Sequence, residues 1–269
     1  MQQPKLVACD VDGTLLDWTA KASPRTADVV RRVVAAGVPF VLATGRPPRW
    51  IPPVVDELGH AGLAVCANGA LLYDAAADGV LDTITLPPLR LRELAELLAR
   101  AIPGCLFAAE RPTRSAREEP HEFVVELDYE HPWVGPETVI MPRAELLGHE
   151  AVKLLVRHSE MTSEAMAQAA SALVGDCAYV TFSTSEGLLE LSAPGVSKGS
   201  GLASLARRLG VAAEEVIAFG DMPNDASMLS WAGHGVAMAN AHPTVLRVAD
   251  EVTAPNTHDG VALVLERWF

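Results

Sequence analysis

The chain has 269 residues, of which 49% are hydrophobic and 20% charged, and its 21 basic and 34 acidic residues give a formal net charge of −13. This composition excludes a disordered, collagen-like or coiled-coil protein, and the negative charge argues against a nucleic-acid-binding protein with a broad basic surface. Four widely spaced cysteines form no CxxC pair, which argues against a disulfide framework and a zinc site. We find neither a leader pattern nor an apolar run of about 18 residues, so we expect a cytoplasmic protein without membrane contact.

Short apolar runs alternate with helical patterns over the first third of the chain. The run at residues 5–9 predicts a buried strand, and Ser23 followed by Pro24 predicts the start of a helix. Residues 38–43 and 64–67 predict two further strands. This alternation indicates a parallel sheet with right-handed crossovers.

The middle of the chain has a different pattern, with longer helices and short strands. We predict helices at residues 89–101 and 163–174, and strand-like runs at residues 105–109, 123–127, 152–156 and 178–182. The polar stretch at residues 110–121 (ERPTRSAREEPH) is typical of a mobile or ligand-facing loop. Its arginines, Arg111, Arg114 and Arg117, either clamp an anionic part of a substrate or are solvated. The Ala-rich stretch at residues 74–79 predicts a hinge or turn.

The rhythm of the first third returns near the carboxyl end. We predict helices at residues 199–209, 225–231 and 258–268, and strands at residues 216–219 and 235–238. The fold we expect is α/β, with a Rossmann-like core formed by residues 1–82 and 187–269. Residues 83–186 form a second, α+β domain that is inserted into this core.

The strongest chemical signal is Asp10-Val11-Asp12-Gly13-Thr14, directly after the first predicted strand. Two carboxylates at a strand end suit a hard cation that also binds water and substrate oxygens. The alternative is a solvated Asp-Gly turn, which is common in loops.

Three further segments supply polar groups at the ends of predicted elements. Thr44-Gly45-Arg46 ends the second strand, where a hydroxyl and backbone N–H groups can hold a phosphoryl oxygen; the alternative is a capping threonine in a turn. Lys198 precedes a predicted helix, where a lysine is favourable if an anion lies between it and the helix; the alternative is an exposed lysine.

The last segment is Gly220-Asp221-Met222-Pro223-Asn224-Asp225, after the strand at residues 216–219. Asp221 can complete a metal site with Asp10, and Asn224 and Asp225 can hold metal-bound water, the lysine or the substrate. The alternative is a turn followed by a helix cap.

The four segments, in this order and with an insertion between the second and third, resemble the haloacid dehalogenase (HAD) superfamily of phosphotransferases. They are most similar to the Cof-type phosphatases, which carry a large C2 cap. Residues 67–70 (ANGA), 235–241 and 256–261 also match this type. The resemblance covers essentially the whole chain, and it implies a HAD core with a C2-type cap at residues 83–186.

The resemblance implies a role for each site residue. Asp10 is the nucleophile that forms an aspartyl-phosphate, and Asp12 is the acid and then the base. Thr44 and Lys198 hold the substrate phosphoryl group and stabilise its developing charge, and Gly45 binds substrate beside Thr44. Asn224 contacts the substrate phosphate or supports the residues that do. Mg²⁺ is bound by the Asp10 carboxylate, the Asp12 backbone carbonyl and Asp221, with Asp225 behind these ligands.

The implied activity is Mg²⁺-dependent hydrolysis of small phosphomonoesters, such as a sugar phosphate or a similar metabolite. Asp12 favours phosphate esters over halides, because a halide leaving group needs no proton. The alternatives are a phosphomutase or another phosphotransferase on the same fold, and a non-catalytic protein that binds a phosphorylated metabolite. The expected partner is a small phosphorylated metabolite, with no nucleic acid and no membrane, and the expected state is a monomer or small homo-oligomer.

Overall fold

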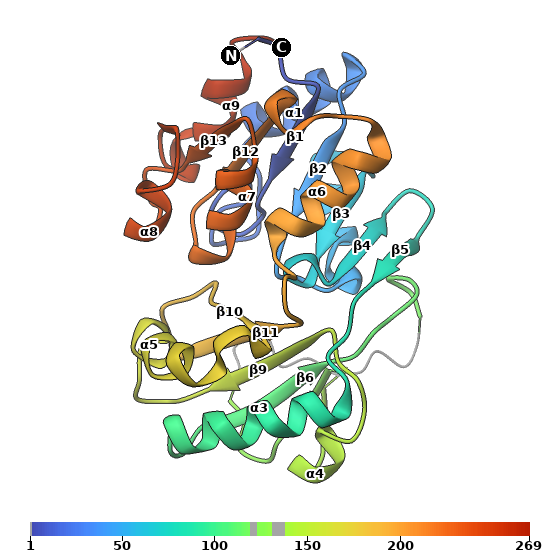
Figure 1. Ribbon diagram of the computed structural model, residues 1–269. Helices are drawn as coiled ribbons and strands as arrows, with labels where there is room; N and C mark the ends of the chain where they lie inside the picture. Colours follow the sequence, from blue (N-terminus) through green and yellow to red (C-terminus); the bar gives the residue numbers. More distant parts are fainter. Residues whose placement is uncertain (1, 119–122, 131–137) are drawn as a thin grey trace.

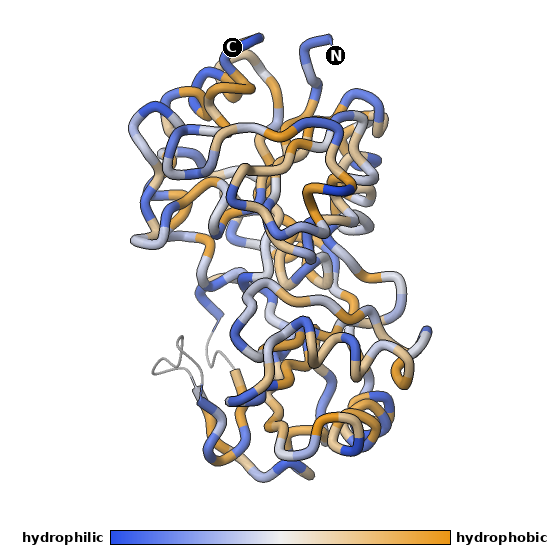
Figure 2. The backbone as a smooth tube through the Cα atoms, turned by 90° about the vertical axis from the view of Figure 1, so that its left-hand side faces the viewer, coloured by the Kyte–Doolittle hydropathy of each residue, from blue (hydrophilic) through white to orange (hydrophobic). Residues whose placement is uncertain are grey.

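Two β-sheets organise the chain, and Figure 1 shows them in separate lobes. The computed structural model describes residues 2–118, 123–130 and 138–269. We call the lobe around the eight-stranded sheet the core lobe and the lobe around the six-stranded sheet the cap lobe. Figure 2, after a quarter turn, shows hydrophobic residues distributed through both lobes.

The sheet of the core lobe has the strand order β14-β13-β12-β1-β2-β3-β4-β5. Its pairs are parallel from β14 to β3, and β4 and β5 add an antiparallel hairpin. The strands are β1 (Leu6–Cys9), β2 (Phe40–Ala43), β3 (Leu63–Cys66), β4 (Leu71–Asp74), β5 (Gly79–Thr83), β12 (Val216–Gly220), β13 (His234–Ala237) and β14 (Glu251–Val252).

Helices cover both faces of this sheet because its central strands are apolar on both sides. In β1, Leu6 and Ala8 pack with α6 and α7, whereas Val7 and Cys9 pack with α1, α2 and α9. Ser23 caps α1 as predicted, since its hydroxyl accepts a hydrogen bond from the N–H of Thr26. The helices are α1 (Pro24–Ala35), α2 (Pro52–Leu58), α6 (Lys198–Leu209), α7 (Ala226–Trp231), α8 (Pro243–Leu246) and α9 (Gly260–Leu265).

The sheet of the cap lobe has the strand order β10-β11-β9-β6-β7-β8 and is mainly antiparallel. Its apolar face packs against α3 and α5, and its other face carries Lys153 and Glu190 toward the core lobe. The elements are α3 (Pro88–Ala101), β6 (Leu106–Glu110), β7 (Phe123–Val125), β8 (Thr138–Ile140), α4 (Arg143–Leu146), β9 (Lys153–Arg157), α5 (Ser163–Val174), β10 (Tyr179–Thr181) and β11 (Leu188–Ser192).

Short 3₁₀ helices occur in several of the loops. They are η1 (Pro48–Trp50), η2 (Ala67–Gly69), η3 (Gly175–Cys177), η4 (Ala213–Glu215), η5 (Pro223–Asp225) and η6 (Asn256–His258). Three of them, η1, η2 and η5, contribute residues to the site described below.

The chain passes between the lobes twice, at residues 84–87 and 193–197 (Figure 1). The expected fold class, a Rossmann-like core with an inserted α+β cap, is confirmed. The predicted boundary at residue 187 places Leu188–Ser192 in the core lobe, whereas β11 pairs with β9 and β10. We therefore propose that the second core segment begins after Ser192, and the boundaries stay a prediction.

Two segments, at residues 74–79 and 110–118, have structures that the sequence pattern predicted only in part. Residues 74–79 form the turn of the β4–β5 hairpin, which the sequence pattern did not reveal as a pair of strands. Glu110 ends β6, and Arg111 donates to the backbone carbonyls of Leu146, His149 and Glu150, so its guanidinium supports the cap. The part of the predicted loop at residues 119–121 lies outside the described residues.

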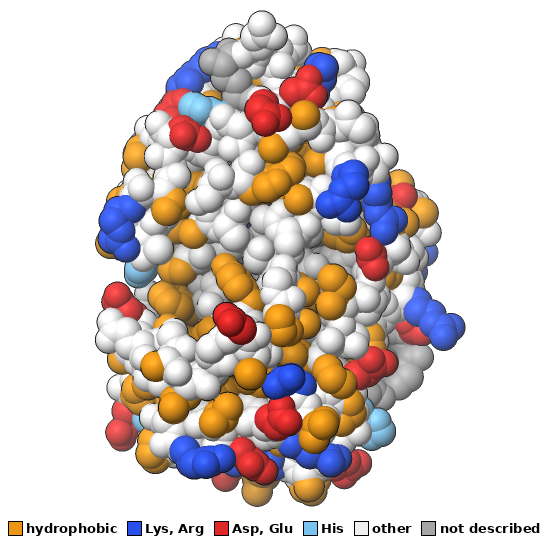
Figure 3. Space-filling model, in the orientation of Figure 1, with side chains coloured by type: hydrophobic (Ala, Val, Ile, Leu, Met, Phe, Trp, Pro, Cys, Tyr) orange, Lys and Arg blue, Asp and Glu red, His pale blue; other side chains and the backbone are white. Residues whose placement is uncertain are grey.

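One face of the molecule carries charges of both signs. On the face drawn in Figure 3, acidic and basic side chains are interspersed. Among the helices in the described part of the chain, none combines the length and apolar character that crossing a bilayer requires.

Candidate active site

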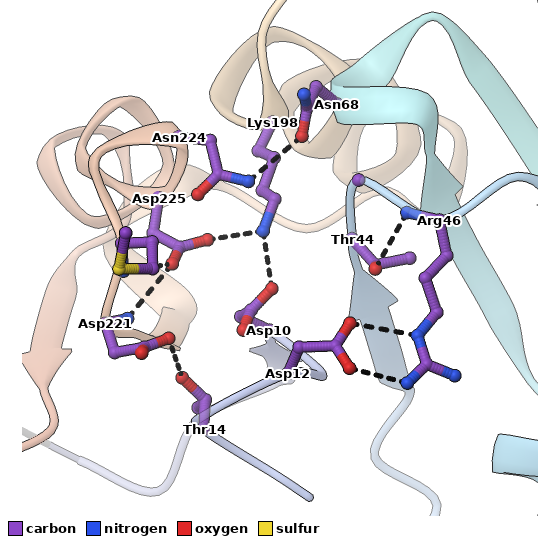
Figure 4. Close-up of polar contacts among 12 residues, drawn as sticks. Asp10, Asp12, Thr14, Thr44, Arg46, Asn68, Lys198, Asp221, Asn224 and Asp225 are labelled. Carbon is purple, nitrogen blue, oxygen red and sulfur yellow. Dashed lines mark hydrogen bonds and ion pairs between the residues drawn. The ribbon is translucent and has the colours of Figure 1, made fainter. Parts of the chain in front are cut away.

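Three neighbouring parallel strands bring the predicted motifs to one edge of the core sheet. Asp10 follows β1, Thr44 follows β2, and Asp221 follows β12, and β1 pairs with both of the other strands. Because these strands are parallel, their carboxyl ends lie side by side, which is where open α/β sheets bind ligands. Figure 4 shows the side chains converging there.

Lys198 lies at the centre of this site. Its Nζ is 2.5 Å from Oδ1 of Asp10 and 2.6 Å from Oδ1 of Asp225, and its side chain is buried (Figure 4). Burial alone would lower the pKa of Lys198, but the two carboxylates outweigh it and raise the pKa. Lys198 is therefore a fixed positive charge that starts α6, and it is not the exposed lysine of the alternative interpretation.

Three carboxylates, those of Asp10, Asp221 and Asp225, each offer an oxygen within 4.8 Å of the others. Burial, followed by the repulsion of Asp225, raises the pKa of Asp10 well above its usual range and that of Asp221 to about 7. Thr14 Oγ1 donates to Asp221 Oδ1 at 2.9 Å, which fixes the orientation of that carboxylate. A cation among these oxygens would favour their ionised forms.

The backbone at Gly13 passes very close to the Asp221 carboxylate. Gly13 has φ of +82°, and a β-carbon there would lie 2.5 Å from Oδ2 of Asp221. Only glycine fits both the conformation and the space. The oxygen donors and this open backbone fit a hard divalent cation such as Mg²⁺.

Asp12 does not join the carboxylate cluster. Its side chain is 60% exposed and forms a bidentate ion pair with Arg46, at 2.9 Å from Nε to Oδ2 and 2.5 Å from Nη2 to Oδ1. The Asp12 carboxylate therefore faces the space above the site, whereas its backbone follows β1.

Thr44 and Asn224 lie on opposite sides of Asp10 (Figure 4). Thr44 is buried, and its Oγ1 accepts a hydrogen bond from the backbone N–H of Arg46 at 3.1 Å. Asn224 is also buried and donates to Oδ1 of Asn68 at 3.1 Å. Within the described residues, its Oδ1 has no hydrogen-bond partner, so this oxygen is available to a bound molecule.

A cavity of about 400 Å³ lies above these residues, between the two lobes. Its floor belongs to the core lobe and its roof to β6, β7, β9 and β11 of the cap lobe. The lining residues are Asp10, Asp12, Gly45, Arg46, Pro47, Trp50, Glu110, Phe123, Lys153, Leu155, Ser183, Glu190, Met222 and Asn224.

The structure brings all the predicted site residues to this edge of the sheet, and their individual roles stay predictions. Sequence reasoning assigned no role to Arg46 or Asn68, although both lie in segments that it singled out. It missed the cap residues Lys153 and Glu190 altogether. One signal was present, because Lys153 is one of only four lysines and interrupts an apolar run.

Comparisons with known proteins agree with this geometry. A family model described as haloacid dehalogenase-like hydrolase matches residues 7–265. The pyridoxal phosphate phosphatase YbhA of Escherichia coli is 30% identical over 268 residues, which cover 96% of each chain. The Bacillus subtilis 5-amino-6-(5-phospho-D-ribitylamino)uracil phosphatase YitU is 28% identical over 278 residues, covering 99% of this chain and 98% of the relative.

Solved structures show the same architecture. A haloacid dehalogenase-like hydrolase from Bacteroides thetaiotaomicron is 29% identical, with a TM-score of 0.75 over 99% of this chain and 100% of its own. A Bacillus subtilis structure of the same description, 23% identical, has the same fold with a TM-score of 0.81 over 98% of this chain and 100% of its own. The chain therefore belongs to the haloacid dehalogenase-like hydrolase family, which confirms the predicted superfamily and the predicted enzyme class, a phosphoester hydrolase.

Proposed function

We propose that this protein hydrolyses small phosphomonoesters with Mg²⁺, through an aspartyl-phosphate formed on Asp10. The observation that carries the proposal is the placement of Lys198, which contacts Asp225 and also Asp10, a residue that lines the interlobe cavity. Asp221 lies in the same cluster. Such a site combines a carboxylate nucleophile with positive charge for a phosphoryl group.

In the first step, an oxygen of Asp10 attacks phosphorus and the bond to the leaving oxygen breaks. The leaving oxygen takes a proton from Asp12, whose exposed carboxyl group reaches into the cavity. In the second step, Asp12 accepts a proton from water and the water oxygen attacks phosphorus. The bond between the Asp10 oxygen and phosphorus breaks, which frees the Asp10 carboxylate and inorganic phosphate.

The phosphoryl oxygens are held by groups from three segments. We propose that the hydroxyl of Thr44, the backbone N–H of Gly45, the ammonium of Lys198 and the second Nδ2–H of Asn224 donate to them; the first Nδ2–H of Asn224 donates to Asn68. Asp225 positions Lys198 through their 2.6 Å contact and also accepts from the backbone N–H groups of Asp221 and Met222.

The metal ligands in this proposal are the carboxylates of Asp10 and Asp221 and the backbone carbonyl of Asp12. The oxygen donors and the glycine at position 13 support this assignment. When bound, Mg²⁺ supplies positive charge that stabilises the phosphoryl oxygens and the ionised carboxylates.

The cavity indicates which leaving groups it accepts. Among the residues that the structure describes, each acidic or basic side chain that lines it has a partner of opposite charge, as Lys153 has in Glu190 and Glu110 has in Arg49. Other walls are apolar, from Trp50, Phe123, Leu155 and Met222. A leaving group without further charge suits this lining, and a sugar phosphate or a similar metabolite remains the expected substrate.

The test is phosphate release from a panel of phosphomonoesters, with Mg²⁺ and with EDTA. The panel contains sugar phosphates, pyridoxal phosphate and 5-amino-6-(5-phospho-D-ribitylamino)uracil, the last two because of the names of the relatives. We expect release that requires Mg²⁺ and that disappears in Asp10→Asn. Transfer of phosphate to a second substrate hydroxyl instead of water would indicate a mutase and would overturn the proposal.

Two expectations about the whole protein accompany this proposal. The cytoplasmic location, and the monomer or small homo-oligomer, remain predictions from the sequence. The expected partner is the phosphorylated metabolite itself.

A further inference from the structure

A continuous chain of hydrogen bonds links the cap lobe to the floor of the site. Lys153 on β9 donates to the backbone carbonyl of Gly45 at 2.8 Å and to Oε1 of Glu190 at 2.8 Å. Oε2 of Glu190, on β11, accepts from Nδ2 of Asn68 at 2.9 Å. Asn68 in turn accepts from Asn224 (Figure 4). We call Lys153, Glu190 and Asn68 the interlobe clasp.

The clasp is buried and its charges balance. Lys153 is 5% exposed and Glu190 is 3% exposed. Burial alone would raise the pKa of Glu190, but the attraction of Lys153 outweighs it and lowers the pKa. A buried ion pair of this kind contributes little net stability but favours one arrangement of its surroundings.

The backbone around Asn68 holds its side chain in one direction. Asn68 has φ of +56°, and the flanking Ala67 and Gly69 also have positive φ. A β-carbon on Gly69 would lie 2.1 Å from the carbonyl oxygen of Ser197, the residue before Lys198. The turn that carries Asn68 is therefore packed directly against the start of α6.

The clasp also packs against the loop after β2. A β-carbon on Gly45 would lie 3.2 Å from Oδ1 of Asn68 and 3.5 Å from Oε1 of Glu190. The clasp thus contacts two of the segments, at Gly45 and at Asn224, that the proposed function assigns to phosphoryl binding.

We propose that Asn68, Glu190 and Lys153 are positioning residues, which fix Gly45 and Asn224 in their phosphoryl-binding geometry when the cap lobe lies over the site. This inference rests on the proposed function for the identity of the bound group. None of the three residues takes part in bond making. They act through the segments that hold the phosphoryl group, so their loss lowers turnover and phosphate affinity together.

A second bridge between the lobes provides a matched control. Arg49 and Glu110 form a bidentate ion pair, at 2.5 Å and 3.1 Å, that joins η1 to β6. This pair joins the same two lobes through η1 and β6, elements that carry neither Gly45 nor Asn224. A variant that weakens the Arg49–Glu110 pair therefore tests the effect of a less firmly attached cap lobe, without a direct change at Gly45 or Asn224.

The test uses Asn68→Asp, the exchanged pair Asn68→Asp/Glu190→Gln, and Glu110→Gln, all in the full chain. Asp suits the left-handed backbone at position 68, but it replaces the N–H donor with an oxygen that faces the Glu190 carboxylate. The exchanged pair restores an N–H donor, now on residue 190, opposite a carboxylate on residue 68. The measurements are kcat and KM for the best ester, affinity for inorganic phosphate with Mg²⁺ by calorimetry, and melting temperature.

We expect Asn68→Asp to lower kcat and phosphate affinity by about tenfold or more, and the exchanged pair to return both to within about threefold of the wild type. Glu110→Gln should raise KM and leave kcat within about twofold. Equal effects of Asn68→Asp and Glu110→Gln on kcat would overturn the inference, because the clasp would then only hold the lobes together. Failure of a folded exchanged pair to recover would overturn it as well.

Phosphate binding keeps the two proposals apart. If the wild type binds phosphate but hydrolyses no ester, the proposed function fails, and the clasp is still judged by the phosphate affinities. If the wild type hydrolyses esters and Asn68→Asp matches it in kcat and in phosphate affinity, the clasp fails and the proposed function stands.

Discussion

The two buried lysines of this chain lie in different lobes and in different electrostatic surroundings. Lys198 in the core lobe contacts two carboxylates, those of Asp10 and Asp225, with Asp221 close by. Lys153 in the cap lobe contacts one carboxylate, that of Glu190, and a backbone carbonyl of the opposite lobe.

The balance of charge differs accordingly. With all groups ionised, three carboxylates and one ammonium give the core site a charge of −3 + 1 = −2, whereas the cap pair gives −1 + 1 = 0. Burying an unbalanced charge is costly, so the core site favours an additional cation or protons. The cap pair needs neither, which suits a positioning role better than a chemical one.

The sharpest way to break this comparison is to remove the proposed nucleophile, Asp10, from the core site. Asp10→Asn retains the size of the side chain but cannot attack phosphorus, so we expect kcat to fall by about 10⁴-fold or more. Phosphate release is the measurement, and the melting temperature shows whether the protein is folded. Persistent release from a pure, folded variant would mean that chemistry does not begin at Asp10.

Removing the core lysine should affect both stability and rate. Lys198→Met leaves Asp10 and Asp225 buried without their cation, and we expect a loss of about 3–5 kcal/mol in the free energy of unfolding. In protein that remains folded, kcat should fall by about 10²–10³-fold. Urea unfolding and steady-state kinetics measure the two effects.

The matched control is Lys21→Met, because the Lys21 side chain is 66% exposed and pairs with Glu57 at the surface. It should leave the unfolding midpoint and kcat near those of the wild type. If both lysine variants were equally stable, the core lysine would not be balancing buried carboxylates.

A change of pH should affect the stability of the core site through Asp221, whose pKa is raised from 3.8 to about 7. Between these two values the folded state holds a proton that the unfolded state has lost, so without metal the free energy of unfolding falls as pH rises. The expected loss is on the order of 2–4 kcal/mol. If Asp221 binds Mg²⁺ as proposed, the ion displaces this proton, so the affinity for Mg²⁺ should rise from pH 6 to pH 8.

Calorimetric titration with Mg²⁺, in buffers of different ionisation enthalpy, measures the released proton. Asp221→Asn is the control, since it should lose both the proton release and most of the Mg²⁺ affinity. Mg²⁺ binding that does not vary with pH would remove Asp221 from the ligand set.

The smallest of these effects is expected at Thr44, which supplies one neutral hydroxyl. Thr44→Val keeps the shape of the side chain, and we expect kcat/KM to fall by about 10–100-fold. Thr44→Ser keeps the hydroxyl and should recover most of the activity. If valine and serine behaved alike, the hydroxyl would not contact the phosphoryl group.

The sequence was most informative about site residues whose position is determined by a single strand. Asp10, Thr44 and Asp221 directly follow apolar strands, so recognising the strands was enough to bring them to one edge. The roles given to them by resemblance add chemistry that spacing alone does not provide.

Contacts that depend on how the two lobes pack were not predictable in this way. The predicted boundary at residue 187 assigned Leu188–Ser192 to the core, but its strand partners are β9 and β10, and local pattern does not specify a partner. For the same reason the contacts of Lys153 and Glu190 with the core lobe could not be foreseen.

The two passages of the chain between the lobes, at residues 84–87 and 193–197, have a mechanical consequence. A body attached at two points retains one easy rotation, about the line that joins them. Opening of the cap lobe is therefore a hinge rotation about this line. In such a rotation the distances from Lys153 to Gly45 and from Glu190 to Asn68 increase together. A pair of spectroscopic labels, one on each lobe, measures the distance between the lobes. Pairs placed at different positions away from this axis should all give the same rotation angle.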